Sequence, residues 1–148
     1  QTAARQDQAR LPGDPMKHPL TPCLGIPVYY DPKLKNISDT RGLWRWKKIV
    51  VGPGFLRLSE REAGAVLLHE AGHCKLHHLE KRLSMVWLVL VSPQRLLRIC
   101  LEQEHEADDF AVKHGYGQDL AQLFSRMEQR KALFHPALSA RIARLKGL

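Results

Sequence analysis

The stretch SEREAGAVLLHEAGH, residues 59–73, decides how this chain of 148 residues should begin its helical part. Ser59 and Glu62 have the spacing of a capping box, in which each side chain satisfies a free backbone N–H at the start of a helix. Apolar residues then recur with helical spacing at positions 63, 66, 67 and 71. The pattern predicts a helix over about residues 59–80.

This helix would carry a His-Glu-x-x-His motif. Side chains four residues apart share one face, so His69 and His73 can present two imidazole nitrogens to one Zn²⁺ ion, about 2 Å from each. Glu70 is rotated by about 100° around the axis and can reach a metal-bound water without ligating the metal. We therefore predict His69 and His73 as zinc ligands and Glu70 as the general base. The simpler alternative is a solvated helix rich in histidine, since His77 and His78 follow.

A catalytic zinc ion usually has three protein ligands. His77 is excluded, because side chains at i and i+8 lie about 12 Å apart along a helix. Glu104 and Asp108 share one otherwise apolar face of the next expected helix, and carboxylates on such a face are costly to bury without a cation. We predict Glu104 as the third ligand and Asp108 as the acceptor that orients a ligand histidine, with a solvated acidic patch as the alternative. Glu102 and Glu106 point elsewhere and are assigned no chemistry.

The rest of the chain indicates a small α+β domain. Residues 1–24 contain four prolines and are expected to form an extended or disordered arm, and residues 25–148 the domain. Short strands are expected at 26–30 and 46–51, followed by four or five helices that include 92–115, 117–133 and 136–145. The apolar run 85–91 is far shorter than the ~20 residues needed to span a bilayer, so we expect a buried helix segment there, with a segment that lies against a membrane as the alternative.

Composition narrows the functional classes. The chain is 44% hydrophobic, enough for a core, and its three isolated cysteines indicate neither a disulfide framework nor a cysteine zinc site. Its net charge of +8 would suit an anionic membrane surface, nucleic acid or acidic substrates. Only the segment 41–48, with Trp44 and Trp46 among basic residues, interleaves aromatics with positive charge. Nucleic acid is therefore not the expected partner, whereas association with a membrane surface stays an open alternative.

Together these motifs resemble those of the HtpX-type zinc metallopeptidases, which include the CAAX prenyl proteases and the mitochondrial Oma-type enzymes. The resemblance covers about residues 26–146. It rests on the following motifs: the lead-in Leu58, Ser59 and Glu62, the His-Glu-x-x-His segment, the Glu104-His105-Glu106-Ala107-Asp108 segment, His135-Pro136, and Arg141-Ile142. Many members have membrane-spanning helices, but the 30 residues between His73 and Glu104 contain no such segment.

The resemblance implies a minimal gluzincin domain of the zincin-like class. It implies that an extended substrate pairs with an edge strand, which we expect at Lys48, Ile49, Val50 and Val51. It also implies that His135 and Arg141 reach the site and donate hydrogen bonds to the oxyanion.

The expected function is a zinc-dependent metalloendopeptidase with Zn²⁺ as cofactor and a protein or peptide as substrate. The alternatives are a cytosolic regulatory metalloprotease of the ImmA/IrrE kind, a zinc-binding adaptor module without turnover, and a basic protein that binds nucleic acid or a membrane surface. We expect a cytoplasmic location, or the cytoplasmic face of a membrane if an anchor precedes residue 1.

Overall fold

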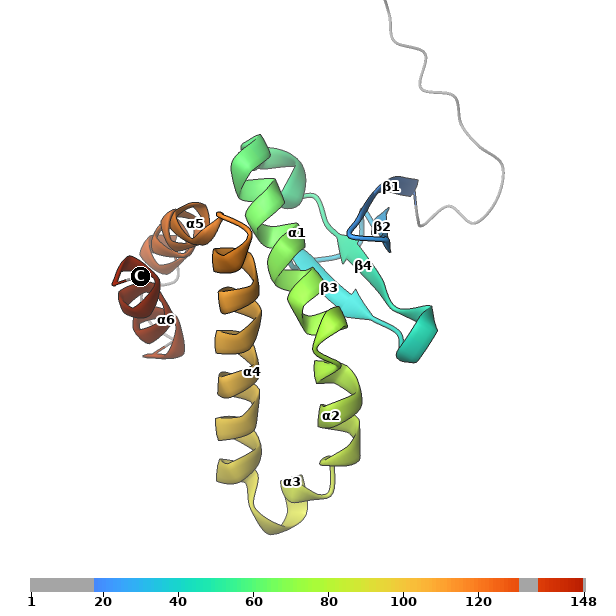
Figure 1. The fold of residues 1–148 in the computed structure, drawn as a ribbon, viewed down its shortest axis with the longest axis vertical. Helices are drawn as coiled ribbons and strands as arrows, with labels where there is room; N and C mark the ends of the chain where they lie inside the picture. Colours follow the sequence, from blue (N-terminus) through green and yellow to red (C-terminus); the bar gives the residue numbers. More distant parts are fainter. Residues whose placement is uncertain (1–17, 131–135, 148) are drawn as a thin grey trace, which may run out of the picture.

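The structure, a computed structural model, describes residues 18–130 and 136–147, and within these residues it is a four-stranded sheet followed by six α-helices (Figure 1). This confirms the expected α+β class and agrees with a small zincin-like domain. The strands are β1 (His18–Cys23), β2 (Ile26–Tyr30), β3 (Ser38–Arg41) and β4 (Lys48–Val51). The helices are α1 (Glu60–Lys75), α2 (His78–Ser84), α3 (Leu88–Val91), α4 (Pro93–Lys113), α5 (Gly117–Arg130) and α6 (Pro136–Lys146).

The strands lie in the order β1-β2-β4-β3, with β2 parallel to β4 and the outer strands antiparallel to their neighbours. The prediction that Lys48–Val51 is the edge strand is therefore wrong: β4 is paired on both sides, and Ile49, Val50 and Val51 are fully buried. The edge beside α1 is β3, whose sequence Ser-Asp-Thr-Arg shows no apolar alternation and was not expected to be a strand.

Strand β1 lies within the residues that the sequence assigned to an N-terminal arm. Residues 1–17 lie outside the described part of the chain, but His18–Cys23 pairs with β2, so the sheet begins before residue 25. Two prolines, Pro19 and Pro22, are compatible with this strand because β1 is at the edge, where a missing N–H leaves no neighbour unpaired.

Helix α1 begins as expected and ends earlier than expected. The capping box between Ser59 and Glu62 is present. The helix ends at Lys75 instead of near residue 80, because His77 adopts a left-handed conformation (φ 58°) and turns the chain into α2. The Lys47 side chain donates a hydrogen bond of 2.7 Å to the carbonyl of Cys74 and so satisfies one of the free carbonyls at this helix end.

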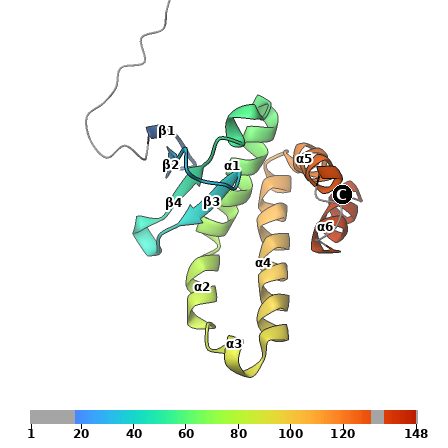
Figure 2. The ribbon, with the colours of Figure 1, turned by 180° about the vertical axis from the view of Figure 1, so that it is seen from behind.

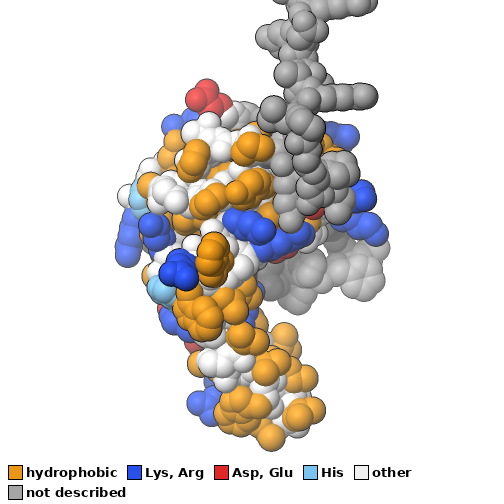
Figure 3. All heavy atoms as spheres, turned by 90° about the vertical axis from the view of Figure 1, so that its right-hand side faces the viewer, with side chains coloured by type: hydrophobic (Ala, Val, Ile, Leu, Met, Phe, Trp, Pro, Cys, Tyr) orange, Lys and Arg blue, Asp and Glu red, His pale blue; other side chains and the backbone are white. Residues whose placement is uncertain are grey.

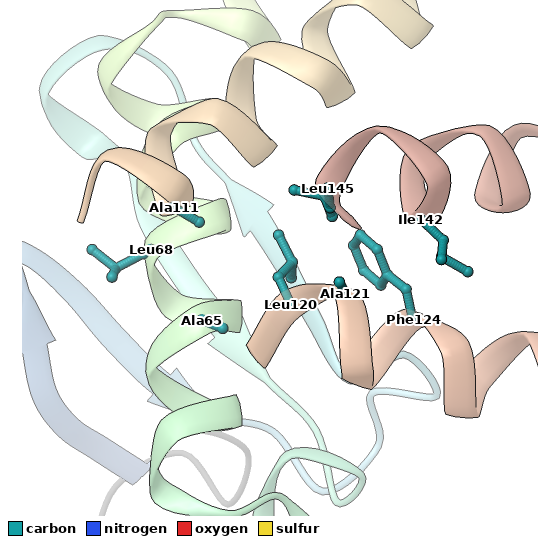
Figure 4. Close-up of a cluster of buried hydrophobic side chains, with 8 residues drawn as sticks. All are labelled: Ala65, Leu68, Ala111, Leu120, Ala121, Phe124, Ile142 and Leu145. Atoms are coloured by element: carbon teal, nitrogen blue, oxygen red, sulfur yellow. The ribbon is translucent and has the colours of Figure 1, made fainter. Parts of the chain in front are cut away.

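Helix α1 lies between the sheet and α4, and α5 and α6 pack on the far side from the sheet (Figures 1 and 2). Its two faces have separate apolar clusters. One joins it to the sheet through residues such as Val28, Ile49 and Ala71. The other joins it to α4, α5 and α6 (Figure 4) and consists of Ala65, Leu68, Ala111, Leu120, Ala121, Phe124, Ile142 and Leu145.

Gly72, inside the histidine motif, allows α1 and α4 to approach closely. A Cβ atom at this position would lie 3.1 Å from the Cα of Ala107 and 3.0 Å from the Cβ of Phe110. Since real Cβ atoms rarely come this close to backbone, a larger residue would push the helices apart. This contact brings the part of α4 that carries Glu104 against His69 and His73.

Helices α2 and α4 run antiparallel and are joined by α3 at the far end of the molecule (Figure 1). The expectation that residues 85–91 form a buried helix segment is wrong for most of them. Leu88 is buried, but Val86, Trp87, Val89, Leu90 and Val91 are more than half exposed, because α4 packs against this turn without covering these side chains. Among the described residues, no helix has the length and apolar character needed to cross a membrane.

Candidate metal centre

The structure brings the three predicted metal ligands together. His69 and His73 come from α1 and Glu104 from α4, and their potential ligand atoms all lie within 4.8 Å of one another. The two Nε2 atoms are 3.1 Å apart, and each lies 3.5 Å from an oxygen of Glu104. Ligand atoms about 2.05 Å from a tetrahedral ion are about 3.3 Å apart, and the two nitrogens have nearly this spacing. The two 3.5 Å distances go to different oxygens of Glu104, Oε2 for His69 and Oε1 for His73, so the three residues form a group that could hold Zn²⁺.

Glu70 is held beside this group by strand β3. Ser38 Oγ donates a hydrogen bond of 2.7 Å to Glu70 Oε1, and Thr40 Oγ1 donates one of 2.5 Å to Glu70 Oε2. The side chain is only 9% exposed, so these two hydroxyls set the direction of the carboxylate. Sequence reasoning missed Ser38 and Thr40, because no local pattern marks a polar strand whose partner is decided by the sheet.

Asp108 of α4 and Arg141 of α6 contact the predicted ligands and support them. Asp108 is fully buried, its Oδ1 lies 3.0 Å from His69 Nδ1, and Arg141 donates to both its oxygens at 2.7 and 2.8 Å. Arg141 also lies 3.2 Å from Glu104 Oε2 and stacks over the ring of Phe124. The structure thus places Arg141 at the site, whereas His135 lies outside the described residues.

The charged groups in this cluster shift one another's pKa values strongly. Burial by itself would lower the pKa of His69, but contacts with Asp108 and Glu104 raise this pKa to about 9. Burial would raise the pKa of Glu104, yet the two histidines hold it far below its usual range. The pKa of Asp108 is likewise lowered by His69 and Arg141 against the effect of burial. A metal ion that binds here must therefore replace the proton on His69.

Two residues that sequence analysis left without a role complete the support of His73. The Nδ1 of His78 lies 2.8 Å from Nδ1 of His73, and His78 Nε2 lies 2.8 Å from Glu106 Oε2. Burial lowers the pKa of His78 to about 4, although the contact with Glu106 opposes the shift, so the ring is neutral at pH 7. If Glu106 accepts from His78 Nε2, then His78 Nδ1 accepts from His73 Nδ1, and His73 Nε2 keeps its lone pair for a metal.

Because His77 adopts a left-handed conformation, the contact between His78 and His73 could not be predicted from the sequence. This turn directs His78, which is fully buried, back toward His73, whereas the side chain of His77 is 60% exposed and contacts Lys47 and Glu80. The exclusion of His77 from the ligand set agrees with this placement. No helical spacing relates positions 73 and 78, so no local signal was available.

His77 and His78 provide a matched test of the contacts that support His73. His78→Leu keeps an apolar volume but removes the acceptor for His73, so we expect zinc affinity to fall by about 10- to 100-fold. His77→Leu should leave the affinity unchanged. Titration with a competing zinc indicator measures both. Equal affinities for the two variants would contradict the role of His78.

Two hollows meet at Glu70 and His69. The first, of about 180 Å³, is lined by β3 and by the polar groups of the centre, including His73 and Glu104. The second, of about 390 Å³, is lined by residues 35–38, by α1, by Arg141 and by apolar side chains of α5, among them Leu120 and Phe124. Both are open to solvent, so an extended chain has access to the carboxylate of Glu70.

Comparison with known proteins found one family whose model matches part of the chain. Residues 40–101 match the model of peptidase family M48, a family of metallopeptidases. The matched segment contains β4 and α1, and thus His69, Glu70 and His73, but it ends three residues before Glu104. Searches of curated proteins and of solved structures gave no match. The match shows that this segment is similar to the M48 peptidase family, and the placement of Glu104 comes from the geometry.

Proposed function

We propose that this protein is a zinc-dependent metalloendopeptidase of the HtpX-type subgroup. One observation carries the proposal: two histidines of one helix and a glutamate of another converge, with one potential ligand atom from each within 4.8 Å of the others, next to a glutamate at an open cleft. Because cytosolic regulatory metalloproteases of the ImmA/IrrE kind share such a ligand set, the subgroup rests on the late His135-Pro136 and Arg141-Ile142 motifs. Arg141 reaches the centre and Ile142 is buried in the core.

In this proposal His69, His73 and Glu104 would hold the ion, which would supply a Lewis acid for the activation of water and of the scissile carbonyl. Glu70 accepts a proton from the attacking water and passes it to the leaving amine. Ser38 and Thr40 keep its carboxylate turned toward the cleft. Asp108 and the pair His78–Glu106 keep the two imidazoles in their ligating orientations.

Arg141 is proposed as a positioning residue. Its guanidinium is shared between Asp108 and Glu104, so its nitrogens are already directed at carboxylates of the centre. This arrangement favours the orientation of the third ligand over direct donation to the oxyanion. The role of oxyanion donor that the resemblance implies for His135 stays a prediction.

The substrate is proposed to be an extended segment of a protein or peptide that pairs with β3. This strand is the outer strand of the sheet on the side of α1, and two of its residues already contact Glu70. A peptide paired with β3 would pass over Glu70, and one of its side chains would enter the apolar hollow beside Phe124. The cytoplasmic location expected from the sequence stays a prediction.

Removal and return of the metal test this proposal. The chain, treated with a strong chelator and dialysed, should lose hydrolysis of an unfolded protein such as reduced casein. About one equivalent of Zn²⁺ should restore it, because the three ligands form a single site. Hydrolysis that survives removal of all metal would contradict the proposal. Stoichiometric zinc binding without any hydrolysis would point to a non-catalytic module instead.

A further inference from the structure

The end of the α2–α3–α4 hairpin is an apolar knob with no partner among the described elements. Figure 3 shows hydrophobic side chains gathered over this projecting end. The exposed fractions there range from 57% for Leu83 to 87% for Leu90. We call this surface the apolar end and define it as Leu83, Val86, Trp87, Leu90, Val91 and Leu97. Isolated exposed hydrophobic residues are normal on proteins, but a contiguous group indicates an interaction surface.

The charged residues of the segment that carries the apolar end all have one sign. Residues 81–101 contain four basic residues and no acidic residue. Lys81 precedes the apolar end, Arg95 and Arg98 lie on either side of Leu97 on α4, and all three side chains are exposed. A convex apolar surface with a collar of cations complements a lipid bilayer whose headgroups are negatively charged.

Several backbone amides of this end already donate hydrogen bonds within it, which favours entry into a bilayer interface. The amides of Leu88, Val89 and Leu90 donate to carbonyls three residues earlier, and the amide of Ser92 donates to the carbonyl of Leu88. Few peptide groups would therefore have to give up hydrogen bonds to water when the side chains enter the acyl boundary. Trp87 adds an amphipathic ring of the kind that prefers the headgroup level.

We propose that the apolar end docks onto an anionic lipid surface, with its apolar side chains in the interface and its basic collar against the headgroups. A second copy of this chain is the weaker candidate, because two like-charged collars would face each other. A partner protein would have to supply an apolar hollow rimmed with acidic groups, whereas an anionic bilayer offers both features. This docking does not depend on the metal centre: Glu104 lies seven residues beyond Leu97, about 10 Å further along α4.

The test uses the whole chain and vesicles of phosphatidylcholine with about one quarter phosphatidylserine, matched to the surface charge of a cytoplasmic leaflet. The parent protein should sediment with these vesicles, bind pure phosphatidylcholine much less, and dissociate as salt is raised. The double variant Trp87→Ser/Leu90→Ser should bind at least about tenfold more weakly, because the apolar area that enters the interface is lost. The variant Arg95→Glu/Arg98→Glu should weaken binding to the anionic vesicles alone, by about 20-fold or more.

Matched control variants lie just before the first residue of α1, away from the apolar end. Leu56→Ser and Arg57→Glu change exposed residues of the same kinds just before that helix and should leave vesicle binding unchanged. All variants should keep the zinc content and the thermal unfolding temperature of the parent. The vesicle test can therefore fail or succeed independently of the proposed enzymatic function. Equal vesicle binding by the parent and the Trp87/Leu90 variant would overturn the proposal. So would self-association that depends on Trp87 and Leu90 without any binding to vesicles.

Discussion

Glu70→Gln should slow peptide hydrolysis by about 10²- to 10⁴-fold while leaving the metal bound. The amide has nearly the same shape as the carboxylate, and the hydroxyls of Ser38 and Thr40 can rotate to accept from it instead of donating. The side chain is not among the three grouped ligands, so zinc content should not fall. What is lost is the group that accepts the proton from water.

This prediction is measured by single-substrate kinetics on a quenched fluorescent peptide, together with metal analysis of the same preparation. Glu60→Gln is the control, since Glu60 is an exposed glutamate in the first turn of the same helix. It should retain the parental rate. A Glu70→Gln protein that cleaves as fast as the parent would show that the general base lies elsewhere.

Glu104→Ala should remove zinc from the purified protein. Loss of a group that merely orients a ligand costs about 10- to 100-fold in affinity, so loss of a ligand itself should cost at least about 100-fold. The substitution also leaves Arg82 and Arg141 without their shared carboxylate, next to two imidazoles. The remaining cluster is more positive, which further disfavours a cation at this site.

Metal analysis and zinc titration of the Glu104→Ala protein, beside Glu102→Ala, provide the measurement. Glu102 is exposed on the same helix, and its substitution should leave one zinc ion per chain. Thermal unfolding of the metal-free proteins distinguishes the loss of a zinc ligand from the loss of the folded structure. If the Glu104→Ala protein retains the parental zinc affinity and fold, the ligand set is wrong.

Most of the helical part could be predicted from local patterns. The capping box at Ser59 and the apolar spacing of α1 are contained in fewer than twenty consecutive residues, and the Ser92-Pro93 start of α4 is equally local. Strand β3 could not be predicted, because its four polar residues become a strand only by pairing with β4. The same pairing made the predicted edge strand wrong, since it moved β4 into the interior of the sheet.

The candidate site, like the fold, could be predicted from the sequence only in part. The sequence by itself determined that His69, Glu70 and His73 share one helix at a fixed spacing, and that Glu104 and Asp108 share a face of another. Only the tertiary structure decided that these two faces meet at Gly72, that β3 orients Glu70, and that His78 and Glu106 support His73. It also decided that the apolar run after α2 is exposed and not buried. The physical reason is that helical spacing is set by local hydrogen bonds, whereas contacts between residues about thirty positions apart depend on how the connecting turns fold.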